Sequence, residues 1–178
     1  MAAKLALIVA GKNAEADRSE TSMNNSTDSC STAPYNLSRF LQAQGEVYDE
    51  ALAEIRSGQK RGHWMWYIFP QLDGLAFSST ARHYAIKSLE EVTAYLEHAV
   101  LGPRLLECAE AIIGVEGRSA REFFGSPDDL KLRSCATLFA CVSPSGSVFE
   151  RLLRKYYRGE DDMKTIELLG INRGIRTS

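Results

Sequence analysis

The clearest pattern in the chain is a helical repeat of apolar residues between residues 36 and 58. The apolar positions recur three or four residues apart, which places their side chains on one face of an α-helix. They are Leu37, Phe40, Leu41, Val47, Tyr48, Ala51, Leu52 and Ile55. Asn36 is a suitable N-cap residue, and Gly58 supplies a C-terminal stop. The pattern therefore predicts one amphipathic helix between these two residues.

The stretch that follows differs because its apolar residues are continuous. Every position from Trp64 to Pro70 is apolar, so neither a helix nor a strand would leave a face for water. We expect a short buried helix over residues 63–69, which Pro70 prevents from continuing, and a buried strand is the alternative. His63 and Gln71 stand at the two ends, are strongly polar, and need partners inside a core. We therefore expect a functional site near them.

Helix start and stop signals divide the rest of the chain. Ser88 to Glu91 and Ser119 to Glu122 are capping boxes, and Ser126 to Asp129 combines an N-cap, a proline at the first helical position and two first-turn carboxylates. With the apolar spacing, these signals predict helices or helical turns over residues 79–86, 89–96, 103–113, 120–124, 127–142, 148–157 and 166–169. No stretch alternates with a period of two. The sequence predicts an all-α fold, a compact single-domain bundle of about seven helices over residues 35–170.

Composition and charge are those of an ordinary globular domain. The chain has 178 residues, of which 44% are hydrophobic and 25% charged. Residues 1–34 are mostly small and polar and predict a disordered N-terminal tail, and residues 171–178 predict a C-terminal tail. The longest N-terminal apolar run, Leu5 to Ala10, is too short for a membrane span or a signal-peptide core, so we expect a cytoplasmic protein. The net charge of −2 attracts neither nucleic acid nor an anionic membrane, and we expect neither as a partner.

Several longer segments resemble a known family. They are His63 to Leu72, Tyr84-Ala85-Ile86, Leu101 to Leu105, Phe124 to Lys131 and Thr137 to Ala140. Their order and residues resemble the family catalogued as domain of unknown function 1810, over about residues 35–170. The resemblance implies a compact, mainly helical single domain without an established activity. Some members carry the label calpastatin, but this chain has no disordered inhibitory repeats, so the label does not transfer.

A second resemblance concerns two short segments, Phe40 to Gln44 and Phe123-Phe124-Gly125. They are similar to parts of the NADAR family, which processes ADP-ribose-type N-glycosides. The motif of that family has a glutamate where this sequence has Ser38 and a lysine where it has Gly45. The resemblance implies ADP-ribose chemistry, but the carboxylate that would assist N-glycoside cleavage is missing at the expected place.

The main functional hypothesis is a pocket for a small anionic ligand, such as a nucleotide or an ADP-ribose derivative. Ligand pockets combine aromatic surface with a few polar groups, and the family-like segments supply both. The predicted ligand-binding residues are His63, Trp66, Gln71, Tyr84, Arg104 and Lys131. The tryptophans and histidines also fit structural roles: Trp64 and Trp66 as core residues, and the histidines as groups with only local hydrogen bonds. Asp128 and Asp129 fit the role of first-turn charges.

Two further hypotheses belong to other classes. One is a non-catalytic domain whose exposed aromatic or basic helix face docks a protein partner, and it is motivated by the aromatic residues at Trp64 to Phe69 and at Tyr156-Tyr157. The other is a metal-independent N-glycosidase. In it, His63 or Asp128 replaces the missing glutamate, and Arg104 and Lys131 hold the phosphates of the substrate. The sequence has no metal-ligand spacing, no nucleotide-binding glycine loop and no nucleophile motif, so we predict neither a metal site nor a cofactor.

Overall fold

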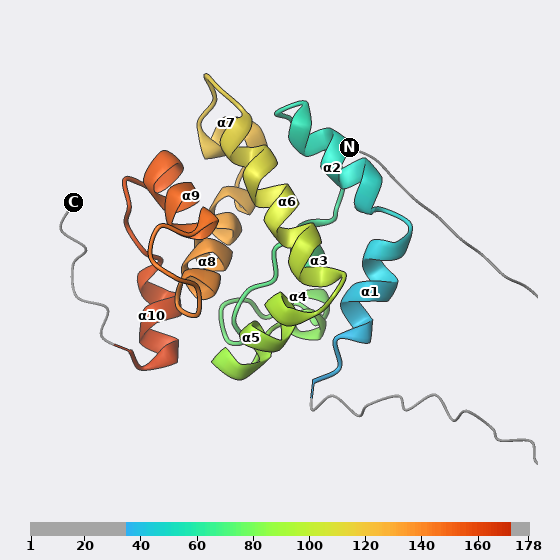
Figure 1. Cartoon of the computed structure of the whole chain (residues 1–178), viewed down its shortest axis with the longest axis vertical. Helices are drawn as coiled ribbons and strands as arrows, with labels where there is room; N and C mark the ends of the chain where they lie inside the picture. The colour runs from blue at the N-terminus through green and yellow to red at the C-terminus, as the bar shows by residue number, and fades with distance from the viewer. Residues whose placement is uncertain (1–34, 172–178) are drawn as a thin grey trace, which may run out of the picture. The chain divides into compact units, whose positions relative to one another are not determined.

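A computed structural model describes residues 35–171 of the protein, which fold into ten helices (Figure 1). They are α1 (Ser38–Gly45), α2 (Tyr48–Arg56), α3 (Met65–Ile68), α4 (Ser79–His83), α5 (Leu89–Glu97), α6 (Leu101–Gly114), α7 (Ala120–Phe124), α8 (Asp128–Ala140), α9 (Val148–Tyr157) and α10 (Met163–Leu169). Within the described range there is no strand, and one isolated parallel bridge joins Leu72 to Ile86. The all-α prediction is confirmed. The predicted tail 1–34 and residues 172–178 lie outside the described residues.

The helix predicted between Asn36 and Gly58 is two helices, α1 and α2. Helix α1 ends at Gly45, and the main-chain N–H of Val47 donates to the carbonyl oxygen of Gln44 at 3.3 Å. Glycine is a poor helix former, and α1 packs against α3 whereas α2 packs against α6. Each of the two helices therefore packs against a different partner helix. The short helices α3, α4 and α7 fall within predicted segments, so this break is the division that the sequence did not predict, and the ten helices exceed the expected number of about seven.

The Trp-rich segment lies in the core, as predicted, with α3 as a single helical turn. Its buried side chains are Trp64, Met65, Ile68 and Phe69. Trp66 and Tyr67 are half-buried, and His63 is exposed. The expectation that this stretch leaves no face for water is therefore corrected. A four-residue helix turns Trp66 and Tyr67 toward the edge of the core rather than into it.

Helix α8 runs through the centre of the core. All of its residues from Ser134 to Ala140 are buried, and it contacts α5, α7, α9 and α10. Its buried Thr137 is satisfied, because the hydroxyl accepts a hydrogen bond from the main-chain N–H of Asp162 at 2.8 Å. In Figure 1, α6 lies between α2 and α9, and it contacts both. None of the helices in residues 35–171 has the length and apolar character that crossing a membrane requires.

The turn between α5 and α6 brings two helices into close contact. His98 Nδ1 accepts hydrogen bonds from the N–H groups of Val100 and Leu101, at 3.1 and 3.3 Å. This histidine therefore has the local structural role that the sequence allows. At Gly102, a Cβ atom would lie 1.9 Å from the carbonyl oxygen of Leu96. Any larger residue at this position would push the two helices apart.

The segment between Pro70 and Ser88 forms a closed loop that carries α4. The main-chain N–H of Ile86 donates to the carbonyl oxygen of Gln71 at 2.9 Å, and the main-chain N–H of Asp73 donates to the carbonyl oxygen of Ile86 at 2.8 Å. Ser78 caps α4 by accepting from the N–H of Ala81 at 3.1 Å. The closed loop holds the end of α4 in place and thereby forms one wall of the cleft described next.

Candidate functional site

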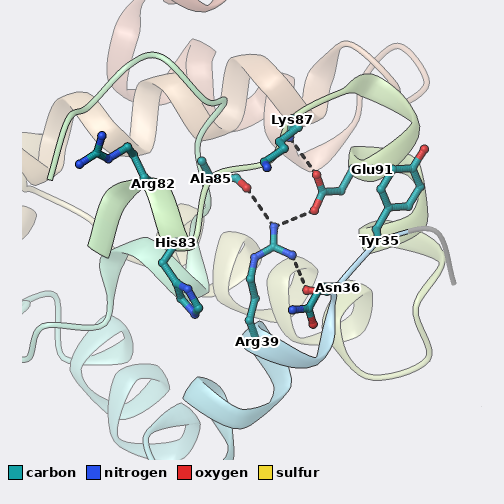
Figure 2. A pocket seen from close by; sticks show the side chains of 8 residues that line it. All are labelled: Tyr35, Asn36, Arg39, Arg82, His83, Ala85, Lys87 and Glu91. Carbon is teal, nitrogen blue, oxygen red and sulfur yellow. Dashed lines mark hydrogen bonds and ion pairs between the residues drawn. The ribbon is translucent and has the colours of Figure 1, made fainter. Parts of the chain in front are cut away.

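A cleft of about 370 Å³ opens between the start of α1, the end of α4 and the start of α5 (Figure 2). Its lining residues are Tyr35, Asn36, Arg39, Arg82, His83, Ala85, Lys87 and Glu91. Six of the eight have side chains with an ionisable group. The cleft is therefore a polar site, built from segments that are far apart in the sequence.

Arg39 forms the floor of the cleft, with a side chain that is only 9% exposed. Its Nη2 donates to Glu91 Oε1 at 2.7 Å and to the carbonyl oxygen of Ala85 at 2.9 Å. Its Nη1 donates to the main-chain oxygen of Asn36. Its Nε is buried and has no hydrogen-bond partner among the described residues. Figure 2 shows this Nε edge turned toward the side of the cleft where His83 lies.

Glu91, in the first turn of α5, supplies the counter-charge to Arg39 and is 4% exposed. Its second oxygen accepts from the main-chain N–H of Lys87 at 2.8 Å. The predicted capping box is therefore half formed: Ser88 accepts from the Glu91 N–H at 3.3 Å, but the Glu91 carboxylate turns to Lys87 and Arg39. Removing one partner of a buried ion pair costs about 3–5 kcal/mol. The pair thus fixes α1 against α5 beneath the cleft.

Basic side chains surround the opening of the cleft. Arg82 and His83 lie in the last turn of α4, Lys87 precedes α5, and all three are exposed. Neither Arg82 nor Lys87 forms an ion pair with a described residue. Three cations and the one carboxylate of Glu91 leave the cleft with a net charge of +2 when His83 is neutral. The cleft is therefore locally positive on a chain whose net charge is −2.

A second cluster of charges lies where the loop before α3 meets α8. Asp128 accepts from Lys60 Nζ and from Lys131 Nζ, each at 2.7 Å. The Lys60 ammonium lies 5.1 Å from the ring centroid of Trp64, and the Lys131 ammonium lies 4.1 Å from that of Trp66. The three charged side chains are 8%, 16% and 15% exposed, in chain order. They satisfy one another and join the loop to α8.

The Asp128 carboxylate is held in its ionised form. Burial raises the pKa of Asp128, but the hydrogen bonds and positive charges of Lys131 and Lys60 outweigh it, so the pKa lies below its usual value. Asp128 is the first residue of α8, and Pro127 rather than the predicted Ser126 is the N-cap residue. At neutral pH this side chain is an acceptor between two ammonium groups, not a proton donor.

The loop before α3 is ordered by Glu54 of α2. Its carboxylate accepts from the main-chain N–H groups of Arg61, at 2.7 Å, and Gly62, at 2.9 Å, and from Trp64 Nε1 at 2.8 Å. Burial opposes ionisation of Glu54, but these hydrogen bonds and the charge of Lys60 lower its pKa overall. The indole N–H of Trp64 is thereby satisfied inside the core.

The structure brings some of the predicted ligand-binding residues together. Trp66 and Lys131 contact each other and share the cluster with Asp128, one of the two catalytic candidates. The Tyr84 ring is 5.4 Å from the Tyr67 ring and 5.9 Å from the Phe40 ring, so it packs toward the core. It is not part of the lining of the cleft.

The other predicted residues lie apart from that cluster. His63 is exposed, and the main-chain oxygen of Gln71 accepts the bridging hydrogen bond from Ile86. Arg104 lies over the Tyr48 ring at 4.5 Å, and its Nη1 donates to Gln44 Oε1 at 3.4 Å. None of the six predicted ligand-binding residues lines the cleft.

Sequence reasoning missed the residues of the cleft because each looks ordinary by itself. Arg39 is one polar residue of an amphipathic helix, and Glu91 is the closing residue of a capping box. The basic residues Arg82, His83 and Lys87 around the apolar Ala85-Ile86 pair are a signal that could have indicated the rim. No group of three or more His, Cys, Asp or Glu side chains in the described part of the chain is arranged to hold a metal ion.

The aromatic residues that the docking hypothesis requires are turned inward to a large extent. The Tyr156 hydroxyl donates to Ile112 at 2.9 Å, and the Tyr157 hydroxyl donates to Asp129 at 2.5 Å, both at main-chain oxygens. Burial raises the pKa of both tyrosines, so they are neutral at physiological pH. These contacts join α9 to α6 and α8.

The chain matches the family described as "Protein of unknown function (DUF1810)" over residues 34–169. Among solved structures it is similar to the conserved hypothetical protein Rv1873 from Mycobacterium tuberculosis, with 52% sequence identity and a TM-score of 0.76. That alignment covers 78% of this chain and 99% of the other chain. Comparison with curated proteins found no match. The resemblance to the NADAR family stays a prediction. The match to the DUF1810 family, in contrast, extends over most of the chain. This protein therefore belongs to the DUF1810 family.

Proposed function

We propose that the protein binds a small anionic ligand in the cleft between α1, α4 and α5. The observation that carries this proposal is the unpaired Nε–H donor of Arg39, in a side chain that is 9% exposed at the floor of the cleft. A buried donor without an acceptor costs about 1–3 kcal/mol. A bound anion that displaces the atoms now covering Nε would satisfy this donor with one of its oxygens, and the bond would be charge-assisted.

The charge of the rim supports an anion rather than a cation. Arg82 and Lys87 are exposed cations that form no ion pair with a described residue, whereas Arg39 and Glu91 neutralise each other beneath them. A ligand that enters the cleft therefore meets an excess of positive charge. An arginine fork presents its donors in a geometry that suits carboxylate and phosphate groups.

The size of the cleft supports a small molecule. Its volume of about 370 Å³ falls within the range of roughly 300–1,000 Å³ that is typical of small-molecule sites. Nucleotides and ADP-ribose derivatives belong to the ligand class that we propose, because each presents phosphate oxygens.

The cluster around Asp128 is a weaker location for such a ligand. Lys60 already donates to Asp128 and to the carbonyl oxygen of Gly62, and Lys131 donates to Asp128 and lies against Trp66. A ligand there would compete with short ion pairs that the protein makes with itself. The rim of the cleft has no such competition.

Calorimetric titration and thermal shift with inorganic phosphate, AMP and ADP-ribose test the proposal. We expect saturable binding by the full-length protein, weakened about tenfold by Arg82→Ala, which corresponds to the loss of about 1.4 kcal/mol. Arg39→Lys keeps the charge opposite Glu91 but removes the Nε donor, so it should also weaken binding. Arg121→Ala is the matched control, because Arg121 is likewise exposed in the last turn of a five-residue helix, α7.

Added salt should weaken the binding, because the rim charges are exposed and screened. Absence of binding by all three anions would refute the proposal. So would binding that Arg82→Ala and Arg39→Lys leave at the level of the Arg121→Ala control.

A further inference from the structure

The cleft has two chemically different sides around Arg39. Figure 2 shows Arg82 and His83 on one side and Tyr35, Asn36 and Glu91 on the other. The first side offers only cationic or ionisable nitrogen groups. The second offers an amide, a carboxylate and a phenol ring. A ligand that fills the cleft therefore presents an anionic group to one side and different groups to the other.

Asn36 has a donor available on the second side. The sequence predicts it as the N-cap residue, but Leu37 takes that position and caps no N–H with its side chain. Asn36 Oδ1 instead accepts from the Ser38 hydroxyl at 2.6 Å, and its main-chain oxygen accepts from Arg39. No described residue accepts from its side-chain NH₂ group. Asn36 is exposed, so this donor can reach a ligand.

Glu91 supplies acceptors on the same side. Each of its oxygens accepts one hydrogen bond, from Arg39 and from the Lys87 N–H. An ionised carboxylate has about four lone-pair sites, so each oxygen retains the capacity for one more. Glu91 lines the cleft although it is only 4% exposed.

Hydroxyl groups match this combination of donor and acceptor. A hydroxyl donates one hydrogen bond and accepts others, so it can donate to the Glu91 carboxylate and accept from the Asn36 amide. An ammonium group has no acceptor for Asn36, and a second anionic group would be repelled by Glu91. A dianionic phosphate balances the net charge of +2 on the cleft, whereas the zwitterion of an amino acid does not.

From these groups we infer that the ligand is a phosphorylated sugar, bound with its phosphate at Arg82, His83 and the Arg39 Nε and with its hydroxyls at Asn36 and Glu91. The Tyr35 ring lies on the sugar side and offers an apolar face to the carbon skeleton. This inference rests on the proposed function, because it names the ligand class of the same cleft. A pentose phosphate or the phosphorylated sugar part of a nucleotide belongs to this class.

Calorimetric titration of the full-length protein with four probes tests the inference: ribose 5-phosphate, inorganic phosphate, ribose and glycine. We expect ribose 5-phosphate to bind about tenfold more tightly than inorganic phosphate, which is the gain that two additional hydrogen bonds give. Ribose and glycine should show no binding in the same concentration range. Asn36→Ala should reduce this preference to about threefold, because the hydrogen bond to Glu91 remains, and should leave the affinity of inorganic phosphate unchanged.

Arg82→Ala is the second variant, and it should weaken both phosphate-bearing probes by the same factor. Equal affinity of the wild type for ribose 5-phosphate and inorganic phosphate overturns the inference and leaves the proposed anion site standing. Tighter binding of glycine than of ribose 5-phosphate also overturns it, in favour of an amino acid ligand. If neither phosphate-bearing probe binds, the inference and the proposed function fail together.

Discussion

Replacing Asp128 by asparagine tests whether the cluster around it is structural. The substitution keeps the shape of the side chain but removes the charge that Lys60 and Lys131 share, at 2.7 Å each. The amide also turns an NH₂ group toward one of the two ammonium groups. Leaving a buried ion without its partner costs about 3–5 kcal/mol. Because the three side chains keep 8%, 16% and 15% exposure, we expect a loss near the lower limit, about 3 kcal/mol.

Urea denaturation at neutral pH measures this loss. Both tryptophans of the protein lie against the cluster, so their fluorescence reports on it directly. With a slope of about 2 kcal/mol/M, a loss of about 3 kcal/mol lowers the unfolding midpoint by about 1.5 M urea. Glu116→Gln is the control, because it also removes a carboxylate that forms an ion pair with a lysine, Lys155. Glu116, however, is 85% exposed. An exposed pair contributes at most about 1 kcal/mol.

The pH dependence separates the charge of Asp128 from its packing. Its pKa is lower in the folded protein than in the unfolded chain, so its contribution is complete above the unfolded pKa, at about pH 4. The contribution is lost as the pH falls through the lower folded pKa. The wild type should therefore lose its advantage over Asp128→Asn in acid. A loss no greater than that of Glu116→Gln, or a difference that does not change with pH, would refute the structural role.

Three other substitutions test the packing around the core. Gly102→Ala should destabilise the protein by about 3 kcal/mol in urea denaturation, because the new Cβ would lie 1.9 Å from a main-chain oxygen. Gly114→Ala, in the same helix, is the control: no atom lies within 4 Å of its Cβ position, so it should not destabilise the protein. Glu54→Gln should reduce stability by about 1 kcal/mol at neutral pH and by less in acid, since its folded pKa is lowered; an effect that grows in acid would contradict this. Tyr95→Phe should lower the free energy of unfolding by about 1 kcal/mol, because the buried Gln44 amide loses the Tyr95 hydroxyl as an acceptor, at 3.0 Å. Unchanged stability would mean that this hydrogen bond contributes nothing.

Local signals predict the helices well where the cap and the apolar face lie within one segment. Ser88 before α5 and Ser147 before α9 each accept from the N–H three residues later. The break after Gly45 does not follow from such signals. It accompanies the packing of α1 on α3, where Gln44 Nε2 donates to the carbonyl oxygen of Tyr67 at 2.7 Å. That contact joins two segments whose proximity no local pattern reveals.

The candidate site shows the same limit more strongly. The sequence indicates that Trp66, Asp128 and Lys131 belong to family-like segments, and these three residues do meet. It does not reveal that Arg39 and Glu91, 52 positions apart, form a buried pair beneath a cleft. A charged residue on an amphipathic helix looks the same in sequence whether it is solvated or paired. Its role emerges from tertiary contacts.

The most direct test of the anion site is the NMR signal of the Arg39 Nε–H group during titration with inorganic phosphate. Our account predicts a saturable shift of this signal, because phosphate oxygen becomes the acceptor that the buried donor lacks among the described residues. The Nε–H signal of Arg121, on α7, should not move with the same saturation. An Arg39 signal that stays constant, or that moves only linearly and in parallel with that of Arg121, would contradict the account.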